Sequence, residues 1–317
     1  MVTATRNMDP PVRVRVVVTC SHRKTRPVPT SHRLRHVTGA QAGTRLKNWT
    51  KRLTDETSTT TPALSLYAGE HWDVARRLGT CRLAACRVEL WVCSAGYGLI
   101  PVEAPISPYS ATFAPGHPDS VPNGRAGAGT WWAALREWSG PVFGPRSLAQ
   151  LAAVDREARL LLVLSRPYLN ACRDDVLAAA SIVASAGGLS IVSAGTKSDS
   201  QLEDLLLPVD ARLQHALGGT RRSLNVRVAE HLLAGGLTTH EEMKTSLERL
   251  LVSQPPVPRY ERLVMTDRQV GGFIRQRLRI DRSVSCTRLL RELRESGHAC
   301  EQRRFSALFH SEAARSQ

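Results

Sequence analysis

The chain has 317 residues, enough for one large or two ordinary domains, and 42% of them are hydrophobic, which excludes wholesale disorder. Its formal net charge is +15, carried at the two ends: residues 1–60 hold 12 Lys or Arg against 3 Asp or Glu, and residues 219–317 hold 18 against 11. This charge favours a polyanionic partner such as DNA or RNA, although a genome rich in arginine codons would produce part of the same excess.

The first part of the chain contains two predicted strands separated by irregular segments. Residues 12–18 read Val-Arg-Val-Arg-Val-Val-Val, and this alternation followed by an apolar run predicts a strand entering the centre of a sheet. A polar loop at 19–24 follows it. The further elements expected here are a short helix at 45–53, a helix at 67–78, a strand at 88–94 and a loop rich in Pro and Gly at 101–129.

Strands and helices alternate in the middle of the chain. Pro167 suits the first turn of a helix that is expected to end near Gly187. The other elements expected are helices at 131–138, 147–154 and 201–217 and strands at 159–165 and 189–193. This order predicts an α/β fold with a mostly parallel sheet sandwiched by helices. In such sheets the loops at the carboxyl ends of the strands line the site, here 19–24, 94–113, 165–168 and 193–199.

A change of composition at residues 218–222 predicts a domain boundary, with an α/β domain at 1–218 and a small, basic, helical domain at 219–317. The helices expected in the second domain are 224–233, 239–251, 266–278 and 285–295. The last helix carries Arg288, Arg291 and Arg294 at intervals of three residues, and Arg303 and Arg304 follow in an expected wing strand. This order is typical of winged-helix-like DNA-binding modules. A helical bundle with solvated arginines would give the same pattern.

Several kinds of chemistry are not indicated. The chain has no Walker A, Gly-x-Ser-x-Gly, His-Glu-x-x-His or Rossmann signature, so that neither an NTP-driven motor nor a zinc hydrolase is expected. Its seven cysteines include no Cys-x-x-Cys pair, which favours a reduced cytoplasm and no metal site. The apolar run at 14–18 is too short for a signal peptide or a membrane span. No organic cofactor and no obligate protein partner are indicated.

Two segments resemble known families. Residues 19–24, Thr-Cys-Ser-His-Arg-Lys, with His32 further along, resemble the Cys-x-x-x-Lys opening of the archaeosine-synthase core domain. Residues 94–100, Ser-Ala-Gly-Tyr-Gly-Leu-Ile, followed by Glu103 and Tyr109, resemble a domain family associated with queuine transglycosylases. Both families are similar in fold to the uracil-DNA glycosylase superfamily. The resemblance covers residues 11–200 and implies a glycosylase-like catalytic domain.

Cleavage of the bond between a base and its sugar passes through an oxocarbenium-like state. It requires a carboxylate near the sugar and a donor for the departing base. Glu103 and Asp119, on the long loop after the second strand, are the candidate carboxylates, and either could instead cap that loop. His22 and Lys24 are candidate donors to a base or a phosphate, and a desolvated Lys24 would be an amine nucleophile.

A flipped base requires an aromatic floor and polar groups that read its edge. Tyr97, Tyr109 and Phe113 are the candidate stacking residues, although each could belong to the core. Gly96 and Gly98 would let the backbone approach a sugar or phosphate closely, or would simply form a turn. The remaining candidates for substrate binding are polar groups at strand ends, namely Cys20, Ser21, Ser94 and Ser193.

The leading hypothesis is a DNA glycosylase that flips and excises a modified base from duplex DNA and leaves an abasic site. The resemblance suggests defence against phages with modified DNA as its setting. A second hypothesis is a transferase that builds or inserts a 7-deazaguanine-type base in tRNA or DNA, using Lys24. A third is a sensor that binds modified DNA without turnover.

Overall fold

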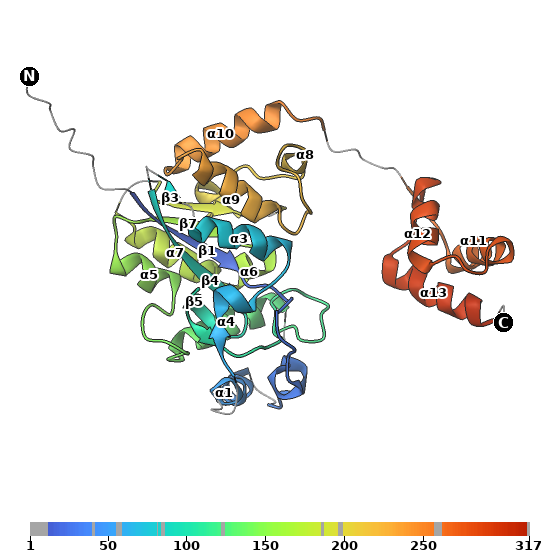
Figure 1. Cartoon of the computed structure of the whole chain (residues 1–317), viewed down its shortest axis with the longest axis horizontal. Helices are drawn as coiled ribbons and strands as arrows, with labels where there is room; N and C mark the ends of the chain where they lie inside the picture. Colours follow the sequence, from blue (N-terminus) through green and yellow to red (C-terminus); the bar gives the residue numbers. More distant parts are fainter. Residues whose placement is uncertain are drawn as a thin grey trace, which may run out of the picture. The chain divides into compact units, whose positions relative to one another are not determined.

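The computed structural model describes residues 12–39, 42–54, 59–80, 82–83, 86–121, 124–184, 187–195, 199–256 and 262–315. The chain forms two compact units, Met1–Pro255 and Pro256–Gln317. Figure 1 shows that the first unit contains the strands of a central sheet between helices and that the second is a small group of helices.

The first unit is built on a sheet in which four strands run parallel in the order β4-β1-β7-β8. These strands are β1 (Val12–Thr19), β4 (Cys86–Ser94), β7 (Arg159–Val163) and β8 (Leu189–Val192). Two short strands, β3 (Arg82–Leu83) and β5 (Gly98–Pro101), pair with β4 in the antiparallel direction. The last three valines of the predicted first strand, 16–18, are completely buried, as expected where helices cover both faces. The predicted α/β fold with a mostly parallel sheet is confirmed.

Helices cover opposite faces of this sheet because successive side chains of a strand point to opposite sides. Val16 lies beside Leu90 in the β1–β4 register, and Leu90 packs under Gly79 of α3 (Glu70–Thr80). Arg15 points the other way and donates to the carbonyl oxygen of Leu151 in α5 (Leu148–Val154). Helix α9 (Leu224–Ala234) packs with α3, and α7 (Arg173–Ile182) packs with α5 (Figure 1).

The remaining elements of the first unit are shorter or lie at its periphery. The helices are α1 (Ala42–Leu53), α2 (Ala63–Leu66), α4 (Gly124–Glu137), α6 (Arg166–Ala171), α8 (Leu213–Leu217) and α10 (His240–Val252). Single 3₁₀ turns occur at Thr30–His32, Leu34–His36 and Glu203–Leu205, and β2 (Thr61–Pro62) pairs with β6 (Pro105–Ile106). Of these, α1, α4, α6, α8 and α10 overlap predicted helices, although α4 begins inside the segment expected to be a loop. Helix α2, strands β2 and β6 and the first two 3₁₀ turns were not predicted.

Two predicted helices differ from the structure. The helix expected from Pro167 to Gly187 is interrupted at Cys172, where α6 ends and α7 begins. The helix expected at 201–217 is limited to one 3₁₀ turn and the five residues of α8. Pro208 lies between these pieces, and a proline lacks the backbone N–H that a continuous helix requires and restricts the residue before it.

The predicted domain boundary at residues 218/219 differs from the division between the two units. Helices α9 and α10 follow residue 218, yet they belong to the first unit. Val228 and Leu232 of α9 are fully buried in the core of the sheet domain, and Leu247 of α10 lies in the same core. The change in composition at residue 218 therefore coincides with a loop inside the first unit.

The second unit has the order β9 (Leu263–Val264), α11 (Asp267–Ile280), α12 (Cys286–Glu295), β10 (His298–Ala299) and α13 (Gln302–Arg315). Its core is separate and contains Ile274, Leu293 and Phe305. Side chains of Thr266 and Ser285 cap α11 and α12 by accepting from the backbone N–H three residues later. The expected wing strand is wrong, because the residues after β10 form α13, which packs through Phe305.

None of the described helices is both long enough and apolar enough to cross a membrane.

Candidate active site

A cavity of about 580 Å³ opens at the carboxyl ends of the parallel strands, and we call it the carboxyl-edge pocket. Its walls come from loops that follow β1, β7 and β8, from the start of α3 and from the loop before α9. The chain passes from β1 to β4 on one side and then to β7 on the other, so the pocket lies where the strand order reverses. The lining residues are Thr19–Arg23, Ala68–His71, Thr112, Ala114, Ser165, Arg166, Tyr168, Ala194, Thr220–Arg222 and Asn225.

The loop after β1 supplies three predicted site residues to this pocket. The Cys20 sulfur lies 3.2 Å from the hydroxyl of Tyr168, and Ser21 donates to the carbonyl of Ala68. The ring of His22 meets the edge of His117 with centroids 4.5 Å apart. Burial, followed by the nearby His117 and Lys24, lowers the pKa of His22, so that this imidazole is neutral near pH 7.

Lys24 lies behind the pocket, outside its lining. Its ammonium group stands 4.4 Å from the ring centre of Tyr109 and 5.1 Å from that of Tyr67. It donates to the carbonyl of Ser21 at 2.5 Å, and so fastens the loop on which Cys20 and His22 lie. Burial lowers the pKa of this amine to about 8.

The Ser-Ala-Gly-Tyr-Gly segment forms the turn between β4 and β5. The Ser94 hydroxyl accepts from the backbone N–H groups of Gly96 and Tyr97 and lies 2.7 Å from the hydroxyl of Tyr109. A Cβ on Gly96 would overlap with the Tyr109 ring, and Gly98 has a φ of 72°. These residues therefore position Tyr109 beneath Lys24 and do not line the pocket.

The other aromatic and hydroxyl candidates are core residues. Tyr97 is 1% exposed, and its hydroxyl accepts from the N–H of Ser107. Phe113 is 7% exposed and packs edge-on against Tyr168 and Trp132. Ser193 is buried at the end of β8. None of the three lines the pocket, so Tyr168 is the aromatic side chain that faces it.

Neither predicted carboxylate reaches the pocket. Asp119 is completely buried, and its two oxygens accept from the guanidinium and backbone N–H of Arg35 and from Ser110. These hydrogen bonds overcome burial and hold the pKa of Asp119 well below its usual range. Glu103 is exposed in the turn after β5, beside Val102, whose N–H bonds to Leu90 in the middle of β4. The antiparallel course of β5 thus carries Glu103 away from the carboxyl edge.

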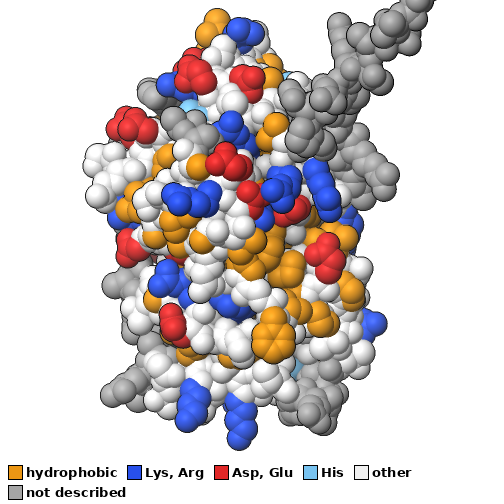
Figure 2. All heavy atoms as spheres, turned by 90° about the vertical axis from the view of Figure 1, so that its left-hand side faces the viewer, with side chains coloured by type: hydrophobic (Ala, Val, Ile, Leu, Met, Phe, Trp, Pro, Cys, Tyr) orange, Lys and Arg blue, Asp and Glu red, His pale blue; other side chains and the backbone are white. Residues whose placement is uncertain are grey.

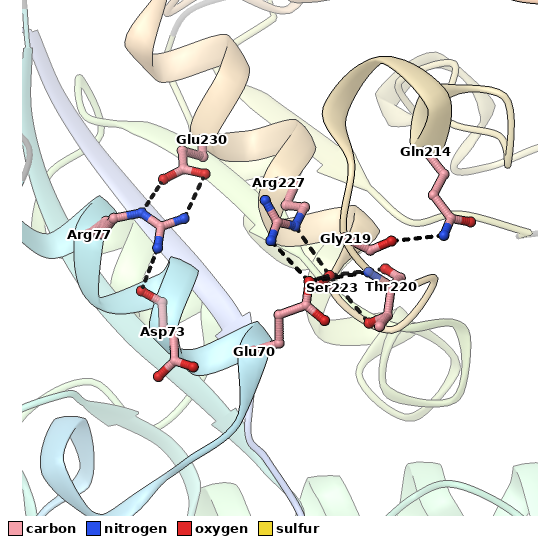
Figure 3. Close-up of polar contacts among 9 residues, drawn as sticks. All are labelled: Glu70, Asp73, Arg77, Gln214, Gly219, Thr220, Ser223, Arg227 and Glu230. Atoms are coloured by element: carbon pink, nitrogen blue, oxygen red, sulfur yellow. Dashed lines mark hydrogen bonds and ion pairs between the residues drawn. The ribbon is translucent and has the colours of Figure 1, made fainter.

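The carboxylate that does line the pocket is Glu70, at the start of α3, which the sequence did not single out. One of its oxygens, Oε1, accepts from the N–H of Thr220, the hydroxyl of Ser223 and the guanidinium of Arg227 (Figure 3). These hydrogen bonds lower the pKa of Glu70 to about 2, so it is ionised at neutral pH. A glutamate in the first turn of a helix is common, so the sequence does not mark Glu70 as a site residue. Its hydrogen-bond partners lie about 150 positions away in the chain.

Two further polar residues complete the walls. His71 Nε2 donates to the carbonyl of Thr19 at 3.2 Å, and burial lowers its pKa, so the neutral ring keeps Nδ1 as an acceptor. Asn225 of α9 accepts from the N–H of Ala194 and donates to the carbonyl of Leu164, which joins the ends of β7 and β8.

Four arginines line the pocket, and none of them was predicted as a site residue. They are Arg23, Arg166, Arg221 and Arg222. All are exposed, and within the described parts of the chain no carboxylate forms an ion pair with them. On the face shown in Figure 2, by contrast, basic and acidic side chains are interspersed. Among the described residues no group of three metal-binding side chains comes together.

The predicted DNA-binding arginines of the second unit occupy three kinds of position. Arg291 and Arg294 line an open groove of about 950 Å³ between α12 and α13, together with Arg262; we call it the α12–α13 groove. Arg294 is also fixed by donating to the carbonyl of Cys300. Arg304 forms an ion pair with Asp267 instead. Arg288 and Arg303 are exposed on α12 and α13 and lie outside the groove lining.

Comparison with known proteins finds no family model, no curated protein and no solved structure that matches this chain.

Proposed function

We propose that the first unit cleaves an N-glycosidic bond in DNA, releasing a base and leaving an abasic site. The observation that carries this proposal is the composition of the carboxyl-edge pocket. It combines an ionised carboxylate, Glu70, with two imidazoles, His22 and His71, and four lining arginines. The carboxylate and a hydrogen-bond donor are the groups that cleavage of the bond between base and sugar requires. In this proposal the catalytic carboxylate is Glu70, and not Asp119 or Glu103 as the sequence suggested.

In the proposed reaction water attacks C1′ of the sugar, the bond between C1′ and the base nitrogen breaks, and the base leaves with its electron pair. Glu70 stabilises the positive charge that develops on the sugar. The acceptor nitrogen of neutral His71 takes a proton from the attacking water and later returns it to solvent. The base leaves as an anion that accepts a hydrogen bond from the neutral His22 ring, and it then takes its proton from solvent. Tyr168 provides an aromatic surface for the base.

DNA is the proposed substrate because the second unit offers a separate basic surface. Residues 262–315 contain 12 arginines and no lysine against 6 Asp or Glu. Arginine binds phosphates through its forked donors, and the α12–α13 groove presents three of these side chains. A modified base is proposed as the one removed, with defence against phages as the setting.

The test incubates the pure full-length chain with unmodified DNA and with phage DNAs that carry different modified bases. Treatment with an abasic-site endonuclease and a denaturing gel then reveal any abasic sites. Fragmentation of at least one DNA is expected. Glu70→Gln should lower the rate by at least about a hundredfold, whereas Glu230→Gln should not, since Glu230 joins the same two helices outside the pocket. Intact DNA throughout would refute the proposal.

A second candidate function uses Lys24 as an amine nucleophile in a base transferase. The observation that favours it is the desolvated amine, whose pKa is lowered to about 8 behind the pocket. A covalent adduct between Lys24 and a sugar would be trapped by borohydride in the same incubation. Cleavage by water alone gives no trapped adduct, so the experiment separates the two functions.

A further inference from the structure

The loop between α8 and α9, residues 218–223, is held in place by hydrogen bonds to Glu70 and Gln214. Glu70 Oε1 accepts from the N–H of Thr220 at 3.1 Å and from the Ser223 hydroxyl at 2.9 Å (Figure 3). Gln214 donates to the carbonyl of Gly219 at 2.8 Å. Arg227 of α9 forms an ion pair with the same Glu70 oxygen at 2.9 Å. The backbone on both sides of residues 221 and 222 is therefore fixed.

The two side chains in the middle of this loop have no hydrogen bond or ion pair to another described residue. Arg221 and Arg222 line the carboxyl-edge pocket and are exposed. Neither forms an ion pair with a carboxylate in the part of the chain that the structure describes. Two exposed guanidinium groups carried by adjacent residues at one opening attract an anion, and a bound anion would offset their mutual repulsion.

The other arginines of the opening come from different loops. Arg23 follows β1, and Arg166 begins α6 after β7. Glu70, the one carboxylate among the described lining residues, is already paired with Arg227, which the lining does not include. The pocket thus has an excess of positive charge on more than one side. Its volume of about 580 Å³ lies in the range of small-ligand sites.

We propose that the carboxyl-edge pocket binds a nucleotide through the phosphates on its 3′ and 5′ sides, and that Arg221 and Arg222 are the main phosphate ligands. The inference rests on the proposed function and names its substrate class: a nucleotide within a strand, and not a free nucleoside. Arginine suits this task because its planar fork donates two hydrogen bonds to one phosphate. Glu70 positions the loop that carries both arginines.

The experiment measures binding of thymidine 3′,5′-bisphosphate, thymidine and citrate to the full-length chain by calorimetry at constant ionic strength. The bisphosphate should bind, thymidine should bind at least about a hundredfold more weakly, and Arg221→Gln and Arg222→Gln should each weaken the bisphosphate about tenfold. Arg249→Gln, an exposed arginine of α10 outside the pocket, is the matched control and should change nothing.

Equal affinity for citrate and bisphosphate would show attraction of any polyanion and would overturn the inference. Unchanged bisphosphate binding in both arginine variants would overturn it as well. The outcome is separable from that of the proposed function. Base release by a chain whose arginine variants still bind normally refutes only this inference, and phosphate binding without base release refutes only the glycosidic activity.

Discussion

At the scale of single residues, burial and hydrogen bonding decide which carboxylate is free for chemistry. Asp119 and Glu70 are both ionised, and both accept hydrogen bonds from arginine. Asp119 is completely buried with both oxygens occupied. Glu70 uses one oxygen for its loop, and its side chain is 36% exposed at the pocket. Asp119 is therefore expected to support the fold, and Glu70 the reaction.

Asp119→Asn should lower the free energy of unfolding at pH 7 by about 2 kcal/mol, because the charged hydrogen bonds to Arg35 are lost. Urea unfolding of the pure chain measures this. The pKa of Asp119 is lowered by folding, so its contribution is complete above the unfolded pKa of about 4 and is lost as the pH falls below that value. The difference between the natural chain and the variant should shrink accordingly. If Asp119→Asn left the stability unchanged but abolished activity, Asp119 would have a catalytic role and not a structural one.

At the scale of elements, the turn between β4 and β5 shows how a conspicuous motif can serve packing. Gly96 leaves room for the Tyr109 ring, and Ser94 holds the turn. The Ser-Ala-Gly-Tyr-Gly motif was singled out because it resembles the hallmark of a known family. Its position directly after a strand was predicted correctly. Its contact with residues of the β1 loop, through Tyr109 and Lys24, depends on the folded arrangement.

Gly96→Ala should destabilise the chain by about 1 to 3 kcal/mol, because the new methyl group overlaps with Tyr109. It should also slow any reaction of the pocket, since Tyr109 lies beneath the lysine that fastens the β1 loop. Gly43→Ala is the matched control: it lies in α1 with open space around it and should be neutral or stabilising by up to about 1 kcal/mol. Thermal unfolding of the two variants and of the natural chain measures these differences in stability. Equal stability of the two would contradict the packing role.

At the scale of the whole molecule, the division of the chain follows burial and not composition. The excess of basic residues begins near residue 218, but the hydrophobic core of the first unit continues through α9 and α10. Residues 262–315 have a core of their own and an excess of arginine. The two units therefore have separate expected tasks, chemistry in the first and binding of the DNA backbone in the second.

A chain that ends at Pro255 should fold and unfold cooperatively, whereas one that ends at residue 218 should not, because it lacks the buried residues of α9 and α10. Circular dichroism during heating measures this. The fragment ending at Pro255 should also bind unmodified duplex DNA at least about tenfold more weakly than the full chain at 0.1 M salt, with a smaller salt dependence. Undiminished binding would place the DNA surface in the first unit.

Local patterns predict the features that depend on neighbouring residues. Strands β1, β4, β7 and β8 and the parallel sheet follow from the periodicity of the apolar residues. The position of the pocket at the carboxyl edge followed from the alternation of strands and helices. Cys20, Ser21 and His22 were found because they directly follow a strand.

The residues that share the pocket are brought together by contacts between distant parts of the chain. Glu70 meets Thr220 and Ser223, which lie about 150 positions later in the chain, and no local pattern records such a pair. Because β5 runs antiparallel to β4, Glu103 lies away from the carboxyl edge of the sheet. The carboxylate of Asp119 accepts hydrogen bonds from Arg35 and is not available to a substrate. The physical reason is the same in each case. Desolvation and hydrogen bonding depend on distances in space, and these are set by how the helices close over the sheet.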